Sequence, residues 1–168
     1  YQAKVTPGSS VAVFGCGGVG DSVIAGARLA GATTLIAVDI DPRKLEWAKD
    51  FGATHTVNSR EVDAVAKIKA LTGGHGVNLS FEAVGRAETL EQAIFCRDNA
   101  GTCIFIGVPG PGKNLTLDLQ RFFDLGGYLG VSWYGNCLPT RDFPMLAEWY
   151  RQGQLNLDKI VTRTIKLE

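Results

Sequence analysis

Three glycines, Gly15, Gly17 and Gly20, have the G-x-G-x-x-G spacing of a turn that binds the phosphates of a dinucleotide. They follow a β-branched apolar run at residues 10–14 and open a stretch with helical periodicity. The first glycine permits a tight turn, the second leaves backbone N–H groups open to a pyrophosphate, and the third allows close helix packing. Because the N-terminus of that helix points at the phosphates, the sequence predicts a dinucleotide site.

A carboxylate, Asp39, closes the next apolar run at residues 34–38. At this position it can accept hydrogen bonds from both ribose hydroxyls of the adenosine half of a dinucleotide, and it repels a 2′-phosphate. We therefore expect NAD(H) in preference to NADP(H). Two alternatives stay open, because Arg43 and Lys44 could neutralise a phosphate and Asp39 could merely flank a turn. Lys44 could equally hydrogen-bond the ribose beside Asp39.

The length of 168 residues suits one domain, residues 1–168, with a substantial core. Seventeen basic and seventeen acidic residues cancel, so the composition indicates neither a nucleic-acid partner nor an anionic membrane surface. No apolar run approaches the roughly 20 residues that span a bilayer, and the first residues lack the pattern of a signal peptide. We expect a cytoplasmic protein.

The residues that could bind a metal or form disulfides are dispersed. No C-x-x-C pair joins the four cysteines, which are Cys16, Cys96, Cys103 and Cys137. Structural zinc sites need closely spaced thiolates, so we expect buried free thiols and no metal. Cys16 alone stands in the phosphate turn, where a helix N-terminus could lower its pKa and permit a redox role. His55 and His75 lie in a strand start and a glycine-rich turn, and neither is expected to bind metal.

Apolar runs alternate with helical patterns along the chain, which is typical of βαβ units around a parallel sheet. The predicted strands are residues 10–14, 34–39, 54–58, 77–82, 101–108 and 128–133. The predicted helices are residues 18–30, 43–51, 61–72, 87–96, 119–125 and 142–151. Right-handed crossovers then give an α/β fold, a doubly wound six-stranded parallel sheet (Rossmann fold) in the order 3-2-1-4-5-6. Its ligand is expected at the switch point between strands 1 and 4.

Local residues support the predicted helix ends. Glycines stand where a left-handed C-terminal residue is needed, at Gly31, Gly52 and Gly153. Asp41 is expected to cap the helix that starts near Pro42, and Asp142 to cap the last helix. Residues 161–167 are predicted to form one more extended segment, after which the chain stops without a closing turn. We therefore expect that the chain is cut from a longer protein.

Linked motifs run through the chain at residues 4–20, 38–40 with Lys44, 51–54, 81–86 and 105–109. Together they resemble the coenzyme domain of the zinc-dependent medium-chain alcohol dehydrogenases, and the resemblance covers essentially all 168 residues. Within that family, residues 130–139 are most similar to the actinobacterial branch of mycothiol-dependent formaldehyde dehydrogenases, which also reduce S-nitrosomycothiol.

The resemblance implies roles for individual residues. It places Gly15, Cys16, Gly17, Gly18, Val19 and Gly20 at the pyrophosphate, Asp39 and Lys44 at the adenosine ribose, and Ile40 and Arg86 beside the adenine. On the nicotinamide side it places Val19, Val84 and Val108, backbone groups of Ile106, Ser132 and Tyr134, and Gly107 as the remaining cofactor-binding position. These contacts would orient the ring so that one face meets the substrate. For the valines, ordinary packing at strand ends is the alternative.

The zinc ligands of that family are missing from this chain. Cys, His and sometimes Glu hold the catalytic metal in such enzymes, and the resemblance places them in a separate catalytic domain, mostly before this segment. No paired carboxylates or Ser/His/Asp arrangement offers another catalytic site. We expect the coenzyme-binding fragment of an NAD-dependent alcohol or formaldehyde-adduct dehydrogenase, inactive alone. The alternative is a freestanding NAD(H)-sensing module.

The sixth predicted strand, residues 128–133, lies at the edge of the sheet and is apolar, uncharged and free of proline. Such an edge exposes unpaired N–H and C=O groups and needs covering. The resemblance implies antiparallel pairing of this strand with its copy across a two-fold axis. We therefore expect a homodimer through this strand.

Overall fold

Strands and helices alternate along residues 2–167, the part of the chain that the computed structural model describes. The strands are β1 (Ser10–Phe14), β2 (Thr34–Asp39), β3 (His55–Asn58), β4 (Val77–Glu82), β5 (Arg97–Phe105) and β6 (Tyr128–Val131). The α-helices are α1 (Gly18–Leu29), α2 (Pro42–Phe51), α3 (Ala64–Leu71), α4 (Ala87–Phe95), α5 (Leu119–Leu125) and α6 (Pro139–Arg151). Two short 3-10 helices, η1 (Tyr134–Asn136) and η2 (Asp158–Ile160), complete the described elements.

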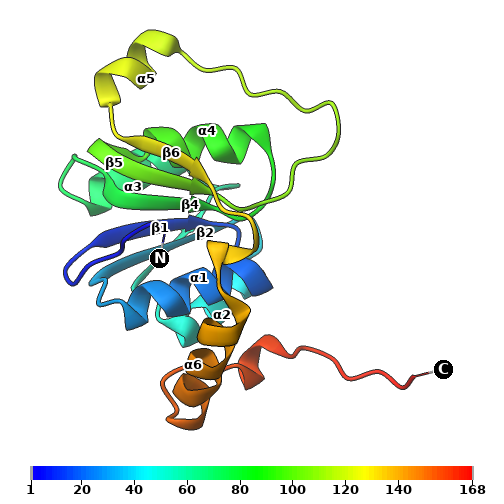
Figure 1. Ribbon diagram of the computed structural model, residues 1–168. Helices are drawn as coiled ribbons and strands as arrows, with labels where there is room; N and C mark the ends of the chain where they lie inside the picture. Colours follow the sequence, from blue (N-terminus) through cyan, green and yellow to red (C-terminus); the bar gives the residue numbers. More distant parts are fainter. Residues whose placement is uncertain (1, 168) are drawn as a thin grey trace.

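The six strands form one parallel sheet in the order β3-β2-β1-β4-β5-β6 (Figure 1). The chain runs outward from β1 to β3, returns to the centre at β4 and continues outward to β6. The order therefore reverses between β1 and β4, which is where doubly wound sheets bind their ligands. The predicted fold class and strand order are confirmed.

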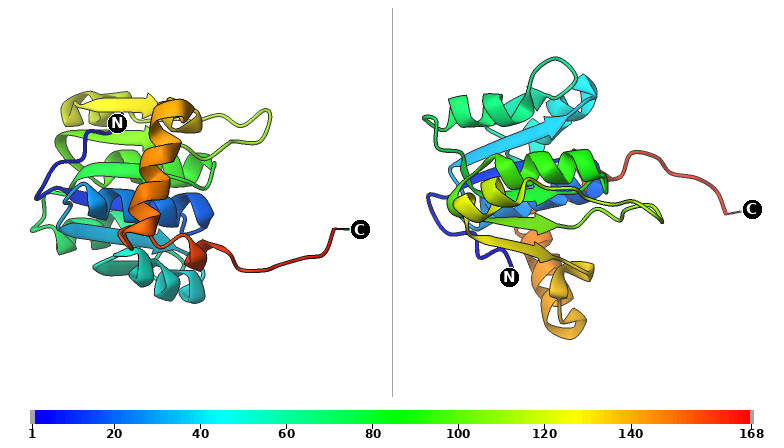
Figure 2. Two further views of the ribbon diagram at one scale, coloured as in Figure 1. Left: turned by 60° about the horizontal axis from the view of Figure 1, so that its bottom comes forward. Right: turned by 90° about the horizontal axis from the view of Figure 1, so that it is seen from above.

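Helices cover both faces of the sheet (Figure 2). On one face α1 and α2 pack against Val11 and Val13 of β1, and on the other face α3 and α4 pack against Ala12 and Phe14. All four side chains are almost completely buried. A strand with two buried faces is a continuous apolar run, which explains why β1 was recognisable in the sequence.

The last helix, α6, lies on the α1 side of the sheet. Trp149 packs against the core cluster on that face, and Asp142 is buried near the start of the helix. Beyond η2, residues 161–167 have no regular secondary structure, and Figure 1 shows them extending away from the sheet.

Several predicted boundaries are wrong. Strand β5 begins at Arg97 and ends at Phe105, where residues 101–108 were predicted. Its first half is polar and irregular, and the strand ends where the N–H groups of Ile106 and Gly107 both donate to the Glu82 carbonyl oxygen. The register with β4 shifts between Val77 and Leu79, and Ala100 has a positive φ of 58°. These features are typical of a bulge.

Two helices start three residues away from their predicted first residue. Helix α3 begins at Ala64 because the Asp63 side chain caps it, accepting a hydrogen bond from the Ala66 N–H at 3.0 Å. Helix α6 begins at Pro139 and not at residue 142. Asp142 lies inside its first turns and accepts a hydrogen bond from the Leu138 N–H at 2.8 Å. Strand β6 ends at residue 131, two residues before the predicted end.

The predicted glycine ends are confirmed, with left-handed φ values of 92° at Gly31, 117° at Gly52 and 71° at Gly153. Asp41 also caps α2 as predicted, since its carboxylate accepts a hydrogen bond from the Arg43 N–H. All four cysteines are free thiols; three are buried and Cys137 is partly exposed, which corrects the expectation that all four are buried.

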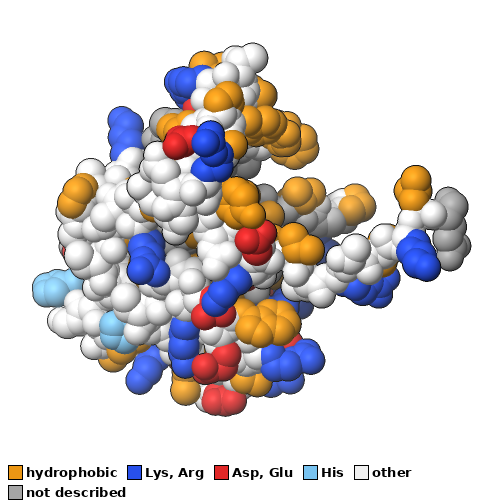
Figure 3. All heavy atoms as spheres, turned by 90° about the horizontal axis from the view of Figure 1, so that it is seen from below, with side chains coloured by type: hydrophobic (Ala, Val, Ile, Leu, Met, Phe, Trp, Pro, Cys, Tyr) orange, Lys and Arg blue, Asp and Glu red, His pale blue; other side chains and the backbone are white. Residues whose placement is uncertain are grey.

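Charged side chains of both signs are interspersed on the face that carries α1, α2 and α6 (Figure 3). Within residues 2–167, no helix is long and apolar enough to cross a membrane.

Candidate functional site

A cleft of about 560 Å³ opens at the carboxyl ends of β1, β2 and β4. It lies at the reversal of strand order, the usual ligand site of an open α/β sheet. Seven of the predicted cofactor residues line it, namely Gly15, Gly17, Asp39, Ile40, Lys44, Val84 and Arg86. The fold thus gathers residues from three separate turns around one cleft.

The glycine turn between β1 and α1 is shaped by contacts that exclude side chains. Gly15 has a left-handed φ of 93°, and a Cβ there would lie 2.7 Å from Cγ2 of Val84. A Cβ at Gly20 would collide with the Gly15 carbonyl oxygen, so the start of α1 can approach the turn only without a side chain.

Gly17 differs from the other two glycines. It is the N-cap of α1 and provides no side-chain cap for the helix. A Cβ at Gly17 would meet no atom within 4 Å, so packing within the protein does not require glycine there. The open space lies in front of the first N–H groups of a 12-residue helix, where the helix dipole favours an anion. A pyrophosphate fits this cradle.

Asp39 is held rigidly at the end of β2. Its Oδ2 accepts a hydrogen bond from the Cys16 N–H at 2.8 Å, and its Oδ1 accepts from Ile40 at 2.7 Å and from Asp41 at 3.0 Å. The carboxylate therefore joins the phosphate turn to the turn after β2. Lys44 lines the same cleft, so an anionic and a cationic group face a ligand there together.

Arg43 is engaged outside the cleft. Its guanidinium contacts Asp41 through Nε at 3.1 Å and Nη2 at 2.8 Å. The hydrogen bonds and charge of Arg43 lower the pKa of Asp41 to about 2. Of the two cations that could neutralise a 2′-phosphate, only Lys44 lines the cleft.

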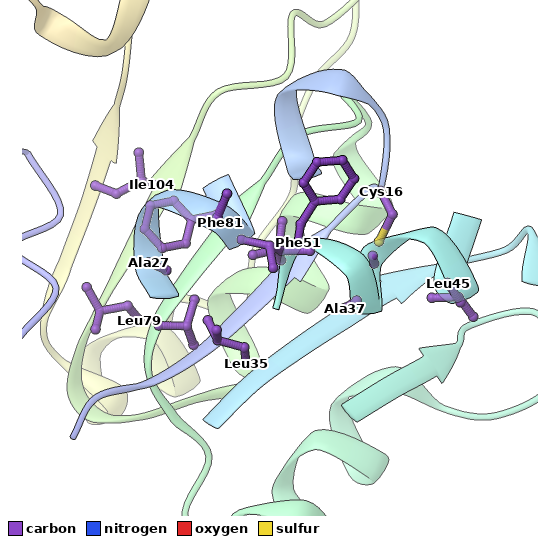
Figure 4. Packing of buried hydrophobic residues seen from close by; sticks show 14 of the residues in the cluster. Cys16, Ala27, Leu35, Ala37, Leu45, Phe51, Leu79, Phe81 and Ile104 are labelled. Atoms are coloured by element: carbon purple, nitrogen blue, oxygen red, sulfur yellow. The ribbon is translucent and has the colours of Figure 1, made fainter. Parts of the chain in front are cut away.

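Cys16 was predicted at the pyrophosphate, but it does not line the cleft, and its N–H is bonded to Asp39. The thiol is buried in the core cluster with Phe51 and Ala37 (Figure 4), and its Sγ is 3.8 Å from the carbonyl oxygen of Val38. Burial, followed by the charge of Asp39, raises the pKa of this thiol far above its ordinary value. The packing interpretation of Cys16 thus agrees with the structure, and a thiolate role does not.

A second carboxylate, Asp21 of α1, lies close to this group and was missed in the sequence. It is 7% exposed, and its Oδ1 has no hydrogen-bond partner. Burial, followed by the charge of Asp39, raises the pKa of Asp21 to about 6. The only signal in the sequence was an acidic residue on the apolar face of a predicted helix.

Apolar side chains are exposed around the predicted cofactor positions. Val19 is 54% exposed, Ile40 52%, Val84 43% and Val108 74%. None of these side chains is fully covered by the described residues. These positions provide an apolar surface of the kind that nucleotide rings contact.

The remaining predicted residues lie outside the cleft lining. The N–H of Ile106 donates to the Glu82 carbonyl oxygen and that of Ser132 to the Phe105 carbonyl oxygen, so both amides are used within the sheet. Tyr134 is 72% exposed and has a positive φ of 52°. Gly18, Val19, Gly20, Gly107 and Val108 likewise do not line the cleft.

Four polar residues that line the cleft were not predicted: Ser59, Glu88, Thr89 and Gln92. Ser59 follows the end of β3, and the other three lie on α4. A serine after a strand and polar residues on a helix are too common to be singled out in a sequence.

No group of three or more His, Cys, Asp or Glu side chains within residues 2–167 is placed to hold a metal ion. His55 contacts only the Thr54 hydroxyl, at 2.9 Å, among the hydrogen bonds of the described residues. These residues do not fit a catalytic zinc.

Residues 18–152 match the family model described as zinc-binding dehydrogenase. The chain belongs to this family. A solved alcohol dehydrogenase zinc-binding domain protein from Burkholderia ambifaria is 39% identical, with a TM-score of 0.90 over 94% of this chain and 42% of its own. Benzyl alcohol dehydrogenase from Acinetobacter calcoaceticus is 36% identical, with a TM-score of 0.90 over 94% of this chain and 43% of its own.

A family structure from Sinorhizobium meliloti 1021 that is bound to NADP is 28% identical, with a TM-score of 0.88 over 96% of this chain and 47% of its own. The chain therefore spans less than half the length of these zinc-binding dehydrogenase relatives. Their likeness confirms the alcohol dehydrogenase family inferred from the motifs.

Proposed function

We propose that this chain is the NAD(H)-binding part of an alcohol dehydrogenase. The observation that carries the proposal is the open cradle at Gly17, which lies at the N-terminus of α1 and beside the carboxylate of Asp39. When bound, the nicotinamide supplies the carbon that accepts or donates a hydride. The chain itself supplies binding and orientation.

Each end of the cofactor has its own residues in this proposal. N–H groups at the start of α1 bind the pyrophosphate, and Asp39 with Lys44 binds the adenosine ribose. Ile40 and Arg86 border the adenine, whereas Val19, Val84 and Val108 face the nicotinamide. Asp39 supports NAD(H) over NADP(H), because a fixed carboxylate repels a 2′-phosphate.

The alcohol and the zinc belong to the rest of the protein in this proposal, since the described residues hold no metal cluster. For the substrate we propose an alcohol or a thiol adduct of formaldehyde, on the strength of the motif at residues 130–139. Assay of the complete protein with simple alcohols and with formaldehyde plus mycothiol would separate these two substrates. If the complete protein turns over neither substrate, the substrate assignment is wrong.

Gly17→Val tests the cofactor site directly. Gly17 has a φ of −106°, which any residue adopts, and an open surrounding, so valine fits without disturbing the fold. It would fill the cradle, and we expect binding of NADH to fall at least about tenfold in a fluorescence titration. Gly110→Val is the matched control, because Gly110 also has no neighbour within 4 Å and lies outside the cleft.

The proposal fails if the Gly17→Val variant binds NADH as tightly as the unmodified chain while its thermal unfolding is unchanged. A freestanding NAD(H)-sensing module would also bind NADH. An assay of the complete protein for alcohol oxidation distinguishes such a module from part of a dehydrogenase, because only the dehydrogenase oxidises an alcohol.

A further inference from the structure

The side chain of Glu82 is completely buried at the end of β4, next to the cleft but not in its lining. Its Oε1 accepts hydrogen bonds from the N–H groups of Val84 at 3.0 Å and Gly85 at 2.9 Å, and from the Thr89 hydroxyl at 2.6 Å. Its Oε2 lies 3.1 Å from the same Gly85 nitrogen. No ion pair of the described residues includes Glu82. A buried carboxylate without a cation is costly unless such hydrogen bonds satisfy it.

The backbone of Glu82 holds a second turn. Its carbonyl oxygen accepts hydrogen bonds from the N–H groups of Ile106 at 2.8 Å and Gly107 at 2.9 Å. A Cβ at Gly107 would lie 2.7 Å from Glu82 Oε2, and a Cβ at Gly85 would collide with the Val108 carbonyl oxygen. The turn after β4 and the turn after β5 are therefore in direct backbone contact, and Glu82 is bonded to both.

These two turns carry the proposed cofactor residues of this side of the sheet. Val84 and Arg86 follow β4 and line the cleft, and Val108 follows β5 with 74% of its surface exposed. Glu82 contacts none of the open space itself. It acts on a ligand only through the residues whose backbone it holds.

We propose that Glu82 is a positioning residue: its side chain fixes the turn after β4, which packs against the turn after β5, and it thereby sets the placement of Val84 and Val108 against the nicotinamide. The inference rests on the proposed function, since it concerns the same cofactor. A buried side chain outside the cleft then determines how well the nicotinamide half is bound, while the pyrophosphate and the adenosine ribose are held elsewhere, by the glycine turn and Asp39.

The hydrogen-bond pattern requires a carboxylate and a hydroxyl. Three donors converge on Glu82, so an amide at this position would direct its own N–H₂ group at the Gly85 N–H in one orientation and at the Val84 and Gly85 N–H groups in the other. Glu82→Gln therefore disrupts the arrangement with almost no change in volume. Thr89→Val is a milder change, because it removes only the hydroxyl donor to Glu82 and keeps the shape of the side chain. Thr89→Ser keeps this donor.

The experiment compares two ligands on the 168-residue chain: NADH, and ADP-ribose, which lacks the nicotinamide. We expect Glu82→Gln to weaken the binding of NADH about tenfold and Thr89→Val to weaken it about fivefold. The affinity for ADP-ribose should change less than about twofold in both variants. Thr89→Ser should restore NADH binding. Glu91→Gln is the control, the same substitution at an exposed position of α4. Thermal unfolding of each variant checks its fold.

Equal losses of NADH and ADP-ribose would overturn the inference, because they would indicate that Thr89 contacts the adenosine or that the variants are generally damaged. Unchanged NADH binding in folded variants would also overturn it. If the Glu82→Gln variant does not fold, the comparison of NADH and ADP-ribose binding by the Thr89→Val and Thr89→Ser variants tests the inference. An unmodified chain that binds neither ligand would refute the proposed function itself, which is a distinct result.

Discussion

The carboxylate of Asp39 has two structural consequences at once. It lies in the cleft, where a ribose is expected, and it accepts the Cys16 N–H at 2.8 Å, which fixes the glycine turn. The position of Asp39 could be predicted because it ends an apolar strand after a glycine turn. Its bond to Cys16 could not, because that bond joins residues 23 apart in the chain and depends on how β1 and β2 align.

Asp21 predicts an unusual dependence of stability on pH. Its pKa is about 6 in the folded protein against an ordinary value of 3.8. The folded state therefore binds the proton more tightly, and the stability gained by protonation is fully present below about pH 4 and lost as pH rises through 6. Asp21→Asn should raise the free energy of unfolding at pH 7.5 by on the order of 1 kcal/mol and flatten its change between pH 4 and 7.

Urea unfolding at several pH values measures this effect, with Asp124→Asn on exposed α5 as the control. The assignment to Asp21 is wrong if the variant and the unmodified chain lose stability with the same slope between pH 4 and 7.

Among the elements, strands β1, β2 and β4 were the most predictable. β1 and β4 match their predicted bounds because their residues are buried on both faces, as the burial of Val11 and Phe81 illustrates. The start of β5 was missed because Arg97 is polar yet completely buried. Its Nε donates to the Ile94 carbonyl oxygen at 2.8 Å, and its Nη1 donates to Gly101. Such a tertiary arrangement of carbonyl groups around a guanidinium leaves no pattern in the sequence.

The edge strand β6 predicts a homodimer. The Ser132 N–H donates to β5, so the peptide groups of Val131 point to the free edge, where its carbonyl oxygen accepts a hydrogen bond from Gln2 Nε2 at 2.9 Å. Val131→Pro removes the outward donor without breaking a bond to β5. We expect this variant to be a monomer by light scattering at micromolar concentration, and the unmodified chain to be a dimer.

Val131→Thr keeps the N–H and the β-branched shape, so it should remain a dimer. A monomeric unmodified chain at the same concentration would show that this edge is protected in another way.

For the whole molecule, the fold brings the glycine turn, Asp39 and Val84 to one end of the sheet, although they are distant in sequence. Exposed apolar groups such as Val108 and Trp133 follow β5 and β6 at that end. The chain covers 42% to 47% of the relatives described above. In our proposal the cofactor is therefore bound by this chain, and the alcohol is bound between it and the rest of the protein.

The central claim is that the cleft binds NAD(H) and discriminates against NADP(H), a point that matters because one solved relative is bound to NADP. Titration of the 168-residue chain with NADH and NADPH, followed by fluorescence, tests it most directly. We predict that NADH binds at least about tenfold more tightly, and that Asp39→Ser narrows this preference by about 1 to 3 kcal/mol. Equal affinities in the unmodified chain, or tighter binding of NADPH, would contradict the account.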